Sequence, residues 1–222
     1  RWRHGLFWCI PEEGYVSIVP VEKKDYYTLS SAQKRLYILQ QMELESTAYN
    51  MPEVIPLSKE TGIEKLETTF IKLIRRHESF RTSFRLMDEE PFQKVHDEVA
   101  FEIEYYDLAG KNAEDSEMGS PVEDIIKRFV RPFDLGHGPL FRIGCITISE
   151  QRRLLLFDMH HIITDGTSQK IFTRELLVLY SGEETLPQLP LQYKDYSQWL
   201  RSDAVRDMIR QQGAYWQREF SG

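Results

Sequence analysis

MHHIITDGTS, residues 159–168, stands between two contrasting patterns. A strongly apolar run at residues 154–157 comes before it, and a helical pattern beginning near Thr167 comes after it. This order predicts a strand, then a loop, then a helix, with two histidines where the strand ends.

The adjacent histidines His160 and His161 are expected to point to opposite faces of a sheet, because side chains alternate along a strand. One ring would then hydrogen-bond in the core, and the other would face a cleft, where an imidazole can exchange protons near neutral pH. The residues alone leave two interpretations open. The residue types favour a buried structural pair over one structural and one catalytic histidine. A metal site fits less well, because adjacent strand histidines diverge.

Two further residues of this loop have a chemical use. Asp165 provides a carboxylate that can fix the loop by pairing with an arginine. Gly166 can adopt a positive φ, which other residues rarely do. Both are therefore candidates for shaping the loop around the histidines.

Composition excludes several classes of protein. The chain has 222 residues, of which 41% are hydrophobic, so it can bury a substantial core. Its net charge is −7, and no basic cluster exceeds two residues, so we expect no nucleic acid partner. No apolar run approaches membrane-spanning length and no export signal is evident, so no membrane association is expected. The missing initiating Met indicates a piece of a longer chain.

The two cysteines, Cys9 and Cys145, predict neither a disulfide framework nor a thiol nucleophile. Cys145 lies in an apolar strand pattern, and Cys9 lies near the start of the chain. We therefore expect a reducing, cytoplasmic location.

Periodicity and capping signals predict a chain of alternating strands and helices. Helices are expected at residues 30–42, 63–76, 120–131, 167–181, 193–200 and about 204–220. Strands are expected at residues 51–57, 80–86, 92–96, 101–105, 140–148 and 154–161, and a loop at 109–119. The strand at 140–148 is apolar on both faces and should be central, whereas prolines put 51–57 at an edge or bend.

Five finer expectations concern the helices. Ser30 and Gln33 have the spacing of a capping box, and Ser58 or Thr61 should cap the second helix. In the first helix, the apolar stripe should be Ala32, Leu36 and Leu39, with residues 33–35 at the surface. In the fourth helix, the core face should include Ile171, Phe172 and Leu176. In the last helix, the aromatic stripe Tyr215, Trp216 and Phe220 should lie in the core.

Five segments, in this order, resemble the condensation domains of nonribosomal peptide synthetases. Four of them resemble the first four core motifs of that family, and FDLGHGPLFR resembles a further characteristic segment. They are SSAQKRL (30–36), RHESFRTSF (76–84), FDLGHGPLFR (133–142), MHHIITDGTS (159–168) and YKDYSQW (193–199). The resemblance covers residues 26–199.

The resemblance implies an α/β fold like that of chloramphenicol acetyltransferase. Such domains have two similar lobes, each a mixed, mainly antiparallel sheet packed with helices, and the active site lies between them. The chain has about half the length of a complete domain. We therefore expect residues 21–222 to be the N-terminal lobe without its C-terminal lobe, and residues 1–20 to be a linker. A fragment of this kind is expected to be inactive alone.

The resemblance also implies an acyltransferase-type reaction that forms a peptide bond. The amine of an acceptor aminoacyl thioester attacks the carbonyl carbon of a donor acyl or peptidyl thioester. His161 matches the position assigned to catalysis, and His160 matches a position that supports the motif. Asp165 matches a residue that ion-pairs with an arginine, and Gly166 matches one that lets the backbone pass close to substrate.

Two arginines lie in matched motifs and are candidates for pairing with Asp165. They are Arg81 and Arg35, and ordinary surface positions are the other interpretation of both.

The implied partners are a donor and an acceptor peptidyl carrier domain, the missing C-terminal lobe and an adjacent adenylation domain. Each carrier supplies a 4'-phosphopantetheine arm, so no cofactor or metal is expected to bind this lobe directly.

Four alternatives stay open. An epimerization domain shares the His-His-x-x-x-Asp-Gly pattern, but SSAQKRLYIL resembles the condensation form of the first motif more closely. A heterocyclization domain is disfavoured, because aspartates replace the histidines there. A stand-alone acyltransferase is less expected to carry all four motifs, and a non-catalytic carrier-docking module is less expected to keep the histidines intact. The motifs lean toward the branch that accepts an L-configured donor.

Overall fold

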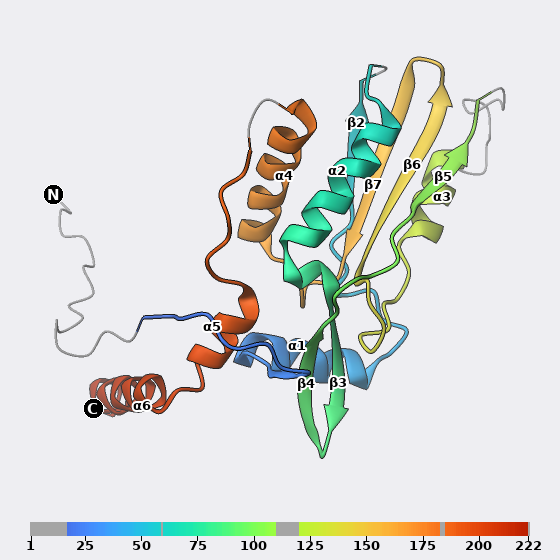
Figure 1. Cartoon of the computed structure of the whole chain (residues 1–222). Helices are drawn as coiled ribbons and strands as arrows, with labels where there is room; N and C mark the ends of the chain where they lie inside the picture. Colours follow the sequence, from blue (N-terminus) through green and yellow to red (C-terminus); the bar gives the residue numbers. More distant parts are fainter. Residues whose placement is uncertain (1–16, 59, 110–119, 183–184, 222) are drawn as a thin grey trace, which may run out of the picture.

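The structure is a computed structural model that describes residues 17–221 except 59, 110–119 and 183–184 (Figure 1). The elements, in order, are β1 (Tyr27–Thr28), α1 (Ser31–Met42), β2 (Glu53–Leu57), α2 (Ile63–Arg76), the 3-10 helix η1 (Glu78–Arg81), β3 (Thr82–Met87), β4 (Glu90–Val95), β5 (Ile103–Asp107), α3 (Pro121–Phe129), β6 (Phe141–Ser149), β7 (Arg152–Met159), α4 (Gly166–Ser181), α5 (Tyr193–Trp199) and α6 (Asp203–Glu219).

The main sheet has four strands in the order β2-β7-β6-β5. β2 and β6 run antiparallel to β7, and only β5 runs parallel to its neighbour β6. The expected mixed, mainly antiparallel sheet is therefore confirmed. β6 lies inside the sheet and β2, with its Pro56, lies at an edge, as the sequence predicted.

A second, three-stranded sheet has the order β1-β4-β3 and contains the predicted hairpin. Its turn uses Asp88 and Glu89, whose φ angles are 48° and 67°. The strand expected from Phe80 begins later, at Thr82, because η1 occupies Glu78–Arg81. Ser83 of β3 is buried together with its neighbours Thr82 and Phe84, so burial does not alternate along this part of the strand. This hairpin projects away from the main sheet (Figure 1).

Helices α2 and α4 cover one face of the main sheet (Figure 1). The rings of Phe70 in α2 and Phe172 in α4 are stacked 6.2 Å apart, and both contact the ring of Phe157 in β7 at 5.6 Å. Burying one such ring stabilises the fold by roughly 1.5–3 kcal/mol. This aromatic cluster is thus the centre of the larger core.

Helix α3 covers the other face, where it forms a second, smaller core with β6 and β7. Ser120 caps α3, because its side chain accepts a hydrogen bond from the Val122 N–H. Gly144 of β6 lies under α3, and a Cβ atom there would come within 2.9 Å of the Phe129 ring. The close approach of α3 therefore requires glycine at this position.

The stripe predicted for α1 is only partly correct: Leu36 packs against the larger core and Leu39 is half-buried, but the fully buried residues of the helix are others. Gln33, Tyr37 and Gln40 are buried on this helix, whereas Ala32 is exposed. Polar residues are buried on α1 because the inner face of the helix packs against hydrogen-bonding groups of β4 and of the histidine loop. The capping box of Ser30 and Gln33 is confirmed.

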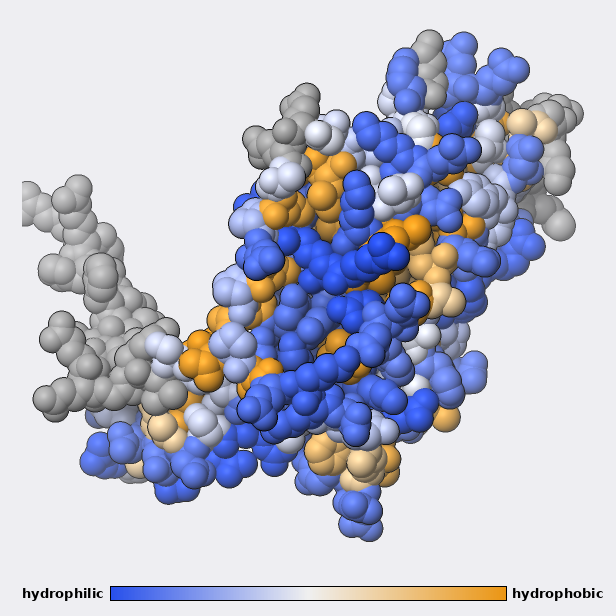
Figure 2. Space-filling view, viewed as in Figure 1, coloured by the Kyte–Doolittle hydropathy of each residue, from blue (hydrophilic) through white to orange (hydrophobic). Residues whose placement is uncertain are grey.

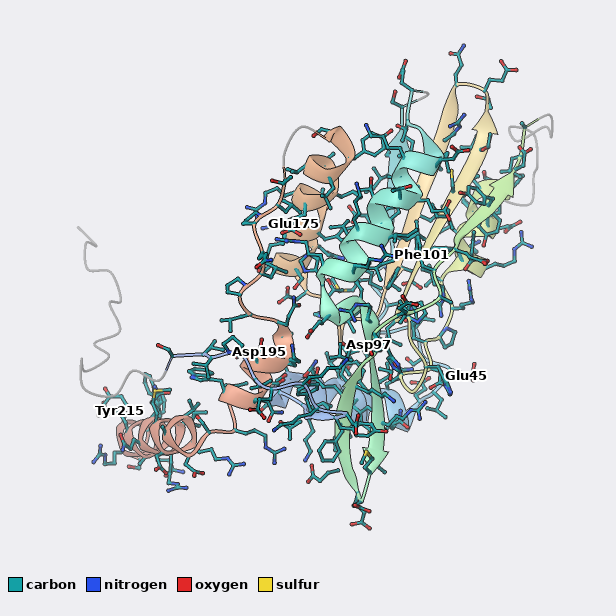
Figure 3. All side chains as sticks on the ribbon, viewed as in Figure 1. Glu45, Asp97, Phe101, Glu175, Asp195 and Tyr215 are labelled. Atoms are coloured by element: carbon teal, nitrogen blue, oxygen red, sulfur yellow. The ribbon has the colours of Figure 1, made fainter. Side chains whose placement is uncertain are left out.

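The core position predicted for the aromatic stripe of α6 is wrong. The exposed fractions are 48% for Tyr215, 50% for Trp216 and 80% for Phe220. α6 lies apart from both sheets, with Tyr215 at its far side, and among the described residues Val205 is its one buried side chain (Figures 1 and 3). The stripe has no described surface to pack against.

Two smaller expectations need correction. The N-cap of α2 is Gly62 and no side-chain cap hydrogen bond is present among the described residues, so neither Ser58 nor Thr61 caps the helix. In α4, Ile171 is exposed, whereas the acidic Glu175 is buried. Gly182, in the αL conformation, ends α4.

Some expectations lie wholly or largely outside the described residues, namely Cys9, most of the 1–20 linker and the 109–119 loop. Cys145 is buried and free. In the described part of the chain, no helix is long and apolar enough to cross a membrane. The surface seen in Figure 2 is mainly hydrophilic, with scattered hydrophobic patches.

Candidate functional site

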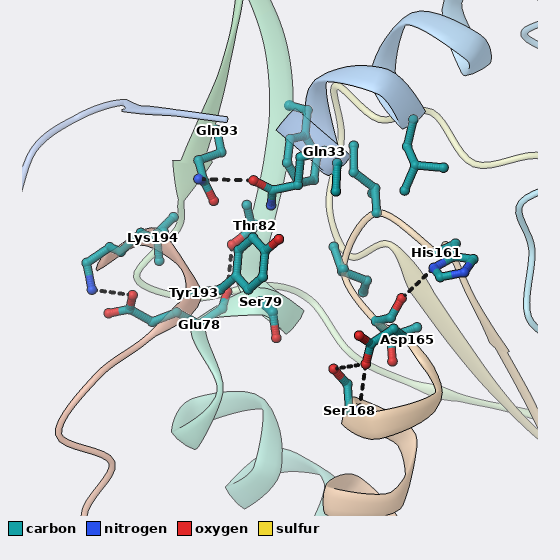
Figure 4. Close-up of a pocket in the computed structure, with 17 residues that line it drawn as sticks. Gln33, Glu78, Ser79, Thr82, Gln93, His161, Asp165, Ser168, Tyr193 and Lys194 are labelled. Carbon is teal, nitrogen blue, oxygen red and sulfur yellow. Dashed lines mark hydrogen bonds and ion pairs between the residues drawn. The ribbon is translucent and has the colours of Figure 1, made fainter. Parts of the chain in front are cut away.

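A cavity of about 170 Å³ lies between α1, the β3–β4 hairpin, α5 and the loop that follows β7 (Figure 4). Four of the five segments singled out in the sequence contribute to its lining. The lining residues are Ala32, Gln33, Leu36, Glu78, Ser79, Thr82, Phe84, Gln93, Val95, His161, Ile162, Ile163, Thr164, Asp165, Ser168, Tyr193 and Lys194. The fold thus brings together motifs that are up to about 160 residues apart.

His161 is exposed and lines this cavity. Its ring Nδ1 lies 2.8 Å from the carbonyl oxygen of Thr164 (Figure 4). A carbonyl oxygen can only accept, so Nδ1 must be the donor, and in the neutral ring Nε2 keeps a free lone pair. The backbone N–H of His161 donates to the Tyr49 carbonyl oxygen at 2.8 Å. Ring and backbone are therefore both held, and Nε2 is the atom that can accept a proton.

His160, by contrast, is completely buried. Its Nδ1 accepts from the backbone N–H of Ile162, and its Nε2 donates to Gln40 Oε1, both at 3.1 Å. The Gln40 amide nitrogen donates to the carbonyl oxygens of Glu43, Leu44 and Ser46, which fixes Oε1 toward the ring. Burial, assisted by the nearby His161, lowers the pKa of His160 to about 4. His160 is thus a neutral structural histidine at pH 7.

The two rings diverge for a different reason than the expected strand alternation. β7 ends at Met159, and His160 forms only an isolated bridge with Asn50. The chain then turns at His161, which carries that side chain out of the core. One buried and one exposed histidine result, as predicted, but through the turn.

Asp165 is the N-cap of α4. Its Oδ1 accepts from both the backbone N–H and the hydroxyl of Ser168, each at 2.7 Å (Figure 4). These hydrogen bonds lower the pKa of the Asp165 carboxyl. The cap fixes the start of α4 next to Thr164, the residue that orients His161.

Neither of the two candidate arginines, Arg81 and Arg35, forms an ion pair with Asp165 within the described residues. The Arg81 guanidinium donates to the carbonyl oxygens of Ile74 and His96 instead. Arg35 is exposed on α1. The helix cap takes over the role of fixing the loop.

Gly166 is the first residue of α4 and does not use a positive φ. A Cβ atom there would meet nothing within 4 Å. The open space above Gly166 is compatible with a substrate passing close to the backbone.

The wall opposite His161 and the residues that contact it include polar side chains that were not predicted as site residues. Ser30 Oγ lies 3.0 Å from the Tyr193 hydroxyl, and Lys194 forms an ion pair with Glu78. The buried Gln93 amide donates to Ser197 Oγ at 2.8 Å. Membership of the matched motifs was an available signal for the first four residues, whereas Gln93 lies in none of them.

A buried ion cluster ties α2 to α4 behind the cavity. Glu175 accepts from Arg76 Nε at 2.9 Å and pairs with His77 Nε2 at 2.6 Å (Figure 3). Burial opposes the charge of Glu175, but the hydrogen bonds from Arg76 and His77 hold its pKa below the ordinary value. The cluster fixes the segment that leads into η1 and the cavity.

The described residues contain no group of three or more His, Cys, Asp or Glu side chains suited to hold a metal ion.

A mixed sheet, helices on both of its faces and a strand-end histidine pair beside a cavity define a lobe with the chloramphenicol acetyltransferase-like fold. The family model described as "Condensation domain" matches residues 23–222. The chain belongs to this family, whose members act in nonribosomal peptide synthetases, so the resemblance seen in the motifs is confirmed.

The curated relatives are large synthetases. The chain is 44% identical over 211 residues to Bacitracin synthase 3 of Bacillus licheniformis, a match that covers 95% of the chain and 3% of the relative. It is 46% identical over 210 residues to Surfactin synthase subunit 1 of Bacillus subtilis (strain 168), which covers 95% of the chain and 6% of the relative. The chain thus spans only a small part of the curated relatives it matches.

Solved structures agree on the fold. An X-domain in complex with OxyB from teicoplanin biosynthesis aligns with a TM-score of 0.77 at 20% identity, over 94% of this chain and 46% of that one. The cyclization-docking bidomain of EpoB from Sorangium cellulosum gives 0.77 at 23% identity, over 95% and 41%. The starter condensation domain of rhizomide synthetase RzmA gives 0.72 at 19% identity, over 90% and 50%. Coverage of about half of those chains fits an N-terminal lobe.

Proposed function

We propose that this chain is the N-terminal lobe of a domain that joins a donor acyl or peptidyl thioester to an acceptor aminoacyl thioester. Both substrates arrive on the 4'-phosphopantetheine arms of carrier domains. The observation that supports this most is the hydrogen bond from His161 Nδ1 to the Thr164 carbonyl oxygen, beside a cavity lined by four matched motifs.

In this proposal His161 acts as a general base. As the acceptor amine nitrogen attacks the donor carbonyl carbon, Nε2 takes one proton from the amine. The bond between the carbonyl carbon and the sulfur then breaks, and the leaving thiolate receives that proton as a thiol. The products are an amide and a free phosphopantetheine thiol. A positioned base of this kind contributes roughly 10²–10⁴ in rate.

The remaining motif residues hold this base in place. His160 stays neutral and fills the interior, and Asp165 fixes the start of α4. The space above Gly166 leaves room for substrate. None of the three exchanges a proton with substrate.

We further propose that the second lobe of the domain provides the other wall of the reaction channel, so that this lobe is inactive alone. An adjacent adenylation domain would load the acceptor carrier, and the reaction would take place in the cytoplasm. The pantetheine arms are substrates here, and no cofactor bound to this lobe itself enters the reaction.

The test joins the chain to the second lobe of its domain and supplies loaded donor and acceptor carriers. Mass spectrometry measures the condensed thioester on the acceptor carrier. We expect His161→Ala to lower the rate by roughly 10²–10⁴. His137→Ala is the matched control, because His137 is an exposed histidine that does not line the cavity. Full activity of His161→Ala would refute the proposal.

The same experiment separates this proposal from two of the alternatives. An epimerization domain would exchange the α-hydrogen of a carrier-bound residue with deuterium from the solvent and form no amide. A carrier-docking module would bind loaded carriers without either reaction.

A further inference from the structure

A polar cluster lies at the end of β7, outside the cavity. Asp158 of β7 is completely buried, and its Oδ2 accepts from Asn50 Nδ2 at 2.7 Å and from an Arg142 terminal nitrogen at 3.0 Å. None of the three residues lines the cavity or takes part in the proposed reaction.

Arg142 is held on several sides. Its terminal nitrogens donate to the carbonyl oxygens of Arg131 and Pro132, each at 2.6 Å. Its guanidinium carbon lies 3.6 Å from the centre of the Phe133 ring, which in turn meets the His160 ring edge-on at 6.2 Å. Arg142 therefore presents its charge to Asp158 from a fixed position.

Residues 49–51 form a short strap across the end of β7. The Met51 N–H donates to the Met159 carbonyl oxygen, and the Tyr49 carbonyl oxygen accepts from the His161 N–H, both at 2.8 Å. Between them, the Asn50 side chain bonds Asp158 and, at 3.0 Å, the Arg131 carbonyl oxygen. The side chain of Asn50 thus anchors the strap that holds the His161 backbone.

The cluster is expected to add little to the free energy of unfolding. Asp158 Oδ1 and Asn50 Oδ1 are buried and accept no hydrogen bond within the described residues. A buried ion pair already loses most of its attraction to desolvation, and unsatisfied acceptors add to that cost. A role in holding geometry explains the cluster better than a role in stability.

We propose that Asn50, Asp158 and Arg142 are positioning residues that set the place of His161 through the strap of residues 49–51. This inference rests on the proposed function of His161. Arg142 fixes Asp158, Asp158 fixes Asn50, and Asn50 fixes the strap whose Tyr49 carbonyl oxygen holds the His161 N–H.

The principal test is Asn50→Ala in the chain joined to its second lobe. We expect kcat for condensation with saturating loaded carriers to fall roughly 10- to 100-fold, because a small displacement of a reacting group has effects of that size. KM for the loaded acceptor carrier should stay within about twofold. Thr47→Ala is the control, because Thr47 lies exposed in the same connection and contributes only its backbone carbonyl oxygen to Asn50.

A second pair of variants separates positioning from simple damage to the fold. Asp158→Asn keeps the shape and an acceptor for Asn50, so it should retain more activity than Asp158→Ala. Adding Asn50→Ala to His161→Ala should cause no further loss, because the strap acts only through His161. Additive losses, or a loss matching the unfolded fraction seen by circular dichroism, would overturn the inference.

The two proposals fail in different ways. If His161→Ala is fully active, the proposed function fails, and the inference fails with it. If His161→Ala is inactive while Asn50→Ala behaves like Thr47→Ala, only the inference fails.

Discussion

Helix α1 buries the polar side chains Gln33 and Gln40, whereas helix α6 leaves Trp216 half-exposed and Phe220 largely exposed. Each glutamine of α1 meets a partner: the Gln33 side chain accepts from the Ser30 N–H, and Gln40 bonds the His160 ring. α6 buries one side chain, Val205, among the residues described. The difference shows that burial depends on what the neighbouring surface offers, and a helix cannot bury a stripe that has no facing surface.

Among the effects expected on the contacts of these two helices, the largest concerns the pH dependence of the contact between α1 and His160. The folded pKa of His160 is about 4, below its ordinary value of 6.5. Between pH 4 and pH 6.5 the unfolded chain therefore binds more protons than the folded chain. The contribution of the buried His160 to the free energy of unfolding is fully present above about pH 6.5 and is lost as the pH falls toward 4. The loss should be about 3 kcal/mol between pH 7 and pH 4.

Denaturant unfolding at several pH values measures this loss. Other groups also titrate between pH 7 and pH 4, so the variant His160→Gln serves as the reference. Over this pH range, its free energy of unfolding should fall by about 3 kcal/mol less than that of the unchanged protein. Equal pH dependence in both proteins would mean that the buried ring is not held neutral.

Removing the glutamine itself should cost somewhat less. Gln40→Ala leaves the buried His160 Nε2–H without its acceptor and should lower the free energy of unfolding by about 2 kcal/mol. Arg35→Ala, on the exposed face of the same helix, should change it by less than about 0.5 kcal/mol. Urea unfolding of both variants measures the difference, and equal values would remove the distinction between the two faces of α1.

The caps of the two helices provide a matched comparison. Ser30 caps α1 and also bonds the Tyr193 hydroxyl, and Ser202 caps α6. Ser30→Ala should cost about 1 kcal/mol of global stability. Ser202→Ala should cost less, because fraying of a poorly packed helix is only weakly coupled to global unfolding. A larger loss for Ser202→Ala in thermal unfolding would show that α6 is more firmly docked than its exposure indicates.

The smallest effect is expected at the aromatic stripe of α6. Trp216→Gln removes a ring that is half-exposed, so the free energy of unfolding of this chain should change by less than about 0.5 kcal/mol. Phe70→Ala, in the aromatic core under α2, is the contrasting variant and should cost roughly 3–5 kcal/mol. Comparable losses in the two variants would contradict the observed exposure.

Much of the fold could be predicted because local signals and tertiary structure agree. The period of α2, the two-sided apolar pattern of β6 and the capping box of Ser30 all reflect short-range geometry that a sequence displays. The position of the histidine pair between a strand and a helix could be predicted in the same way. The partner of Asp165 was not, because a carboxylate has several available donors and only the fold selects Ser168 over an arginine.

The sequence by itself determined the order and type of most elements, the position of the histidine motif and the family. These follow from periodicities and short motifs, which act over a few residues. Only the tertiary structure decided that Gln40 is the partner of His160, that Asp158 pairs with Arg142 and that the aromatic stripe of α6 stays exposed. Each of these depends on whether groups from distant segments come into contact when the chain folds. Local sequence patterns do not predict such contacts.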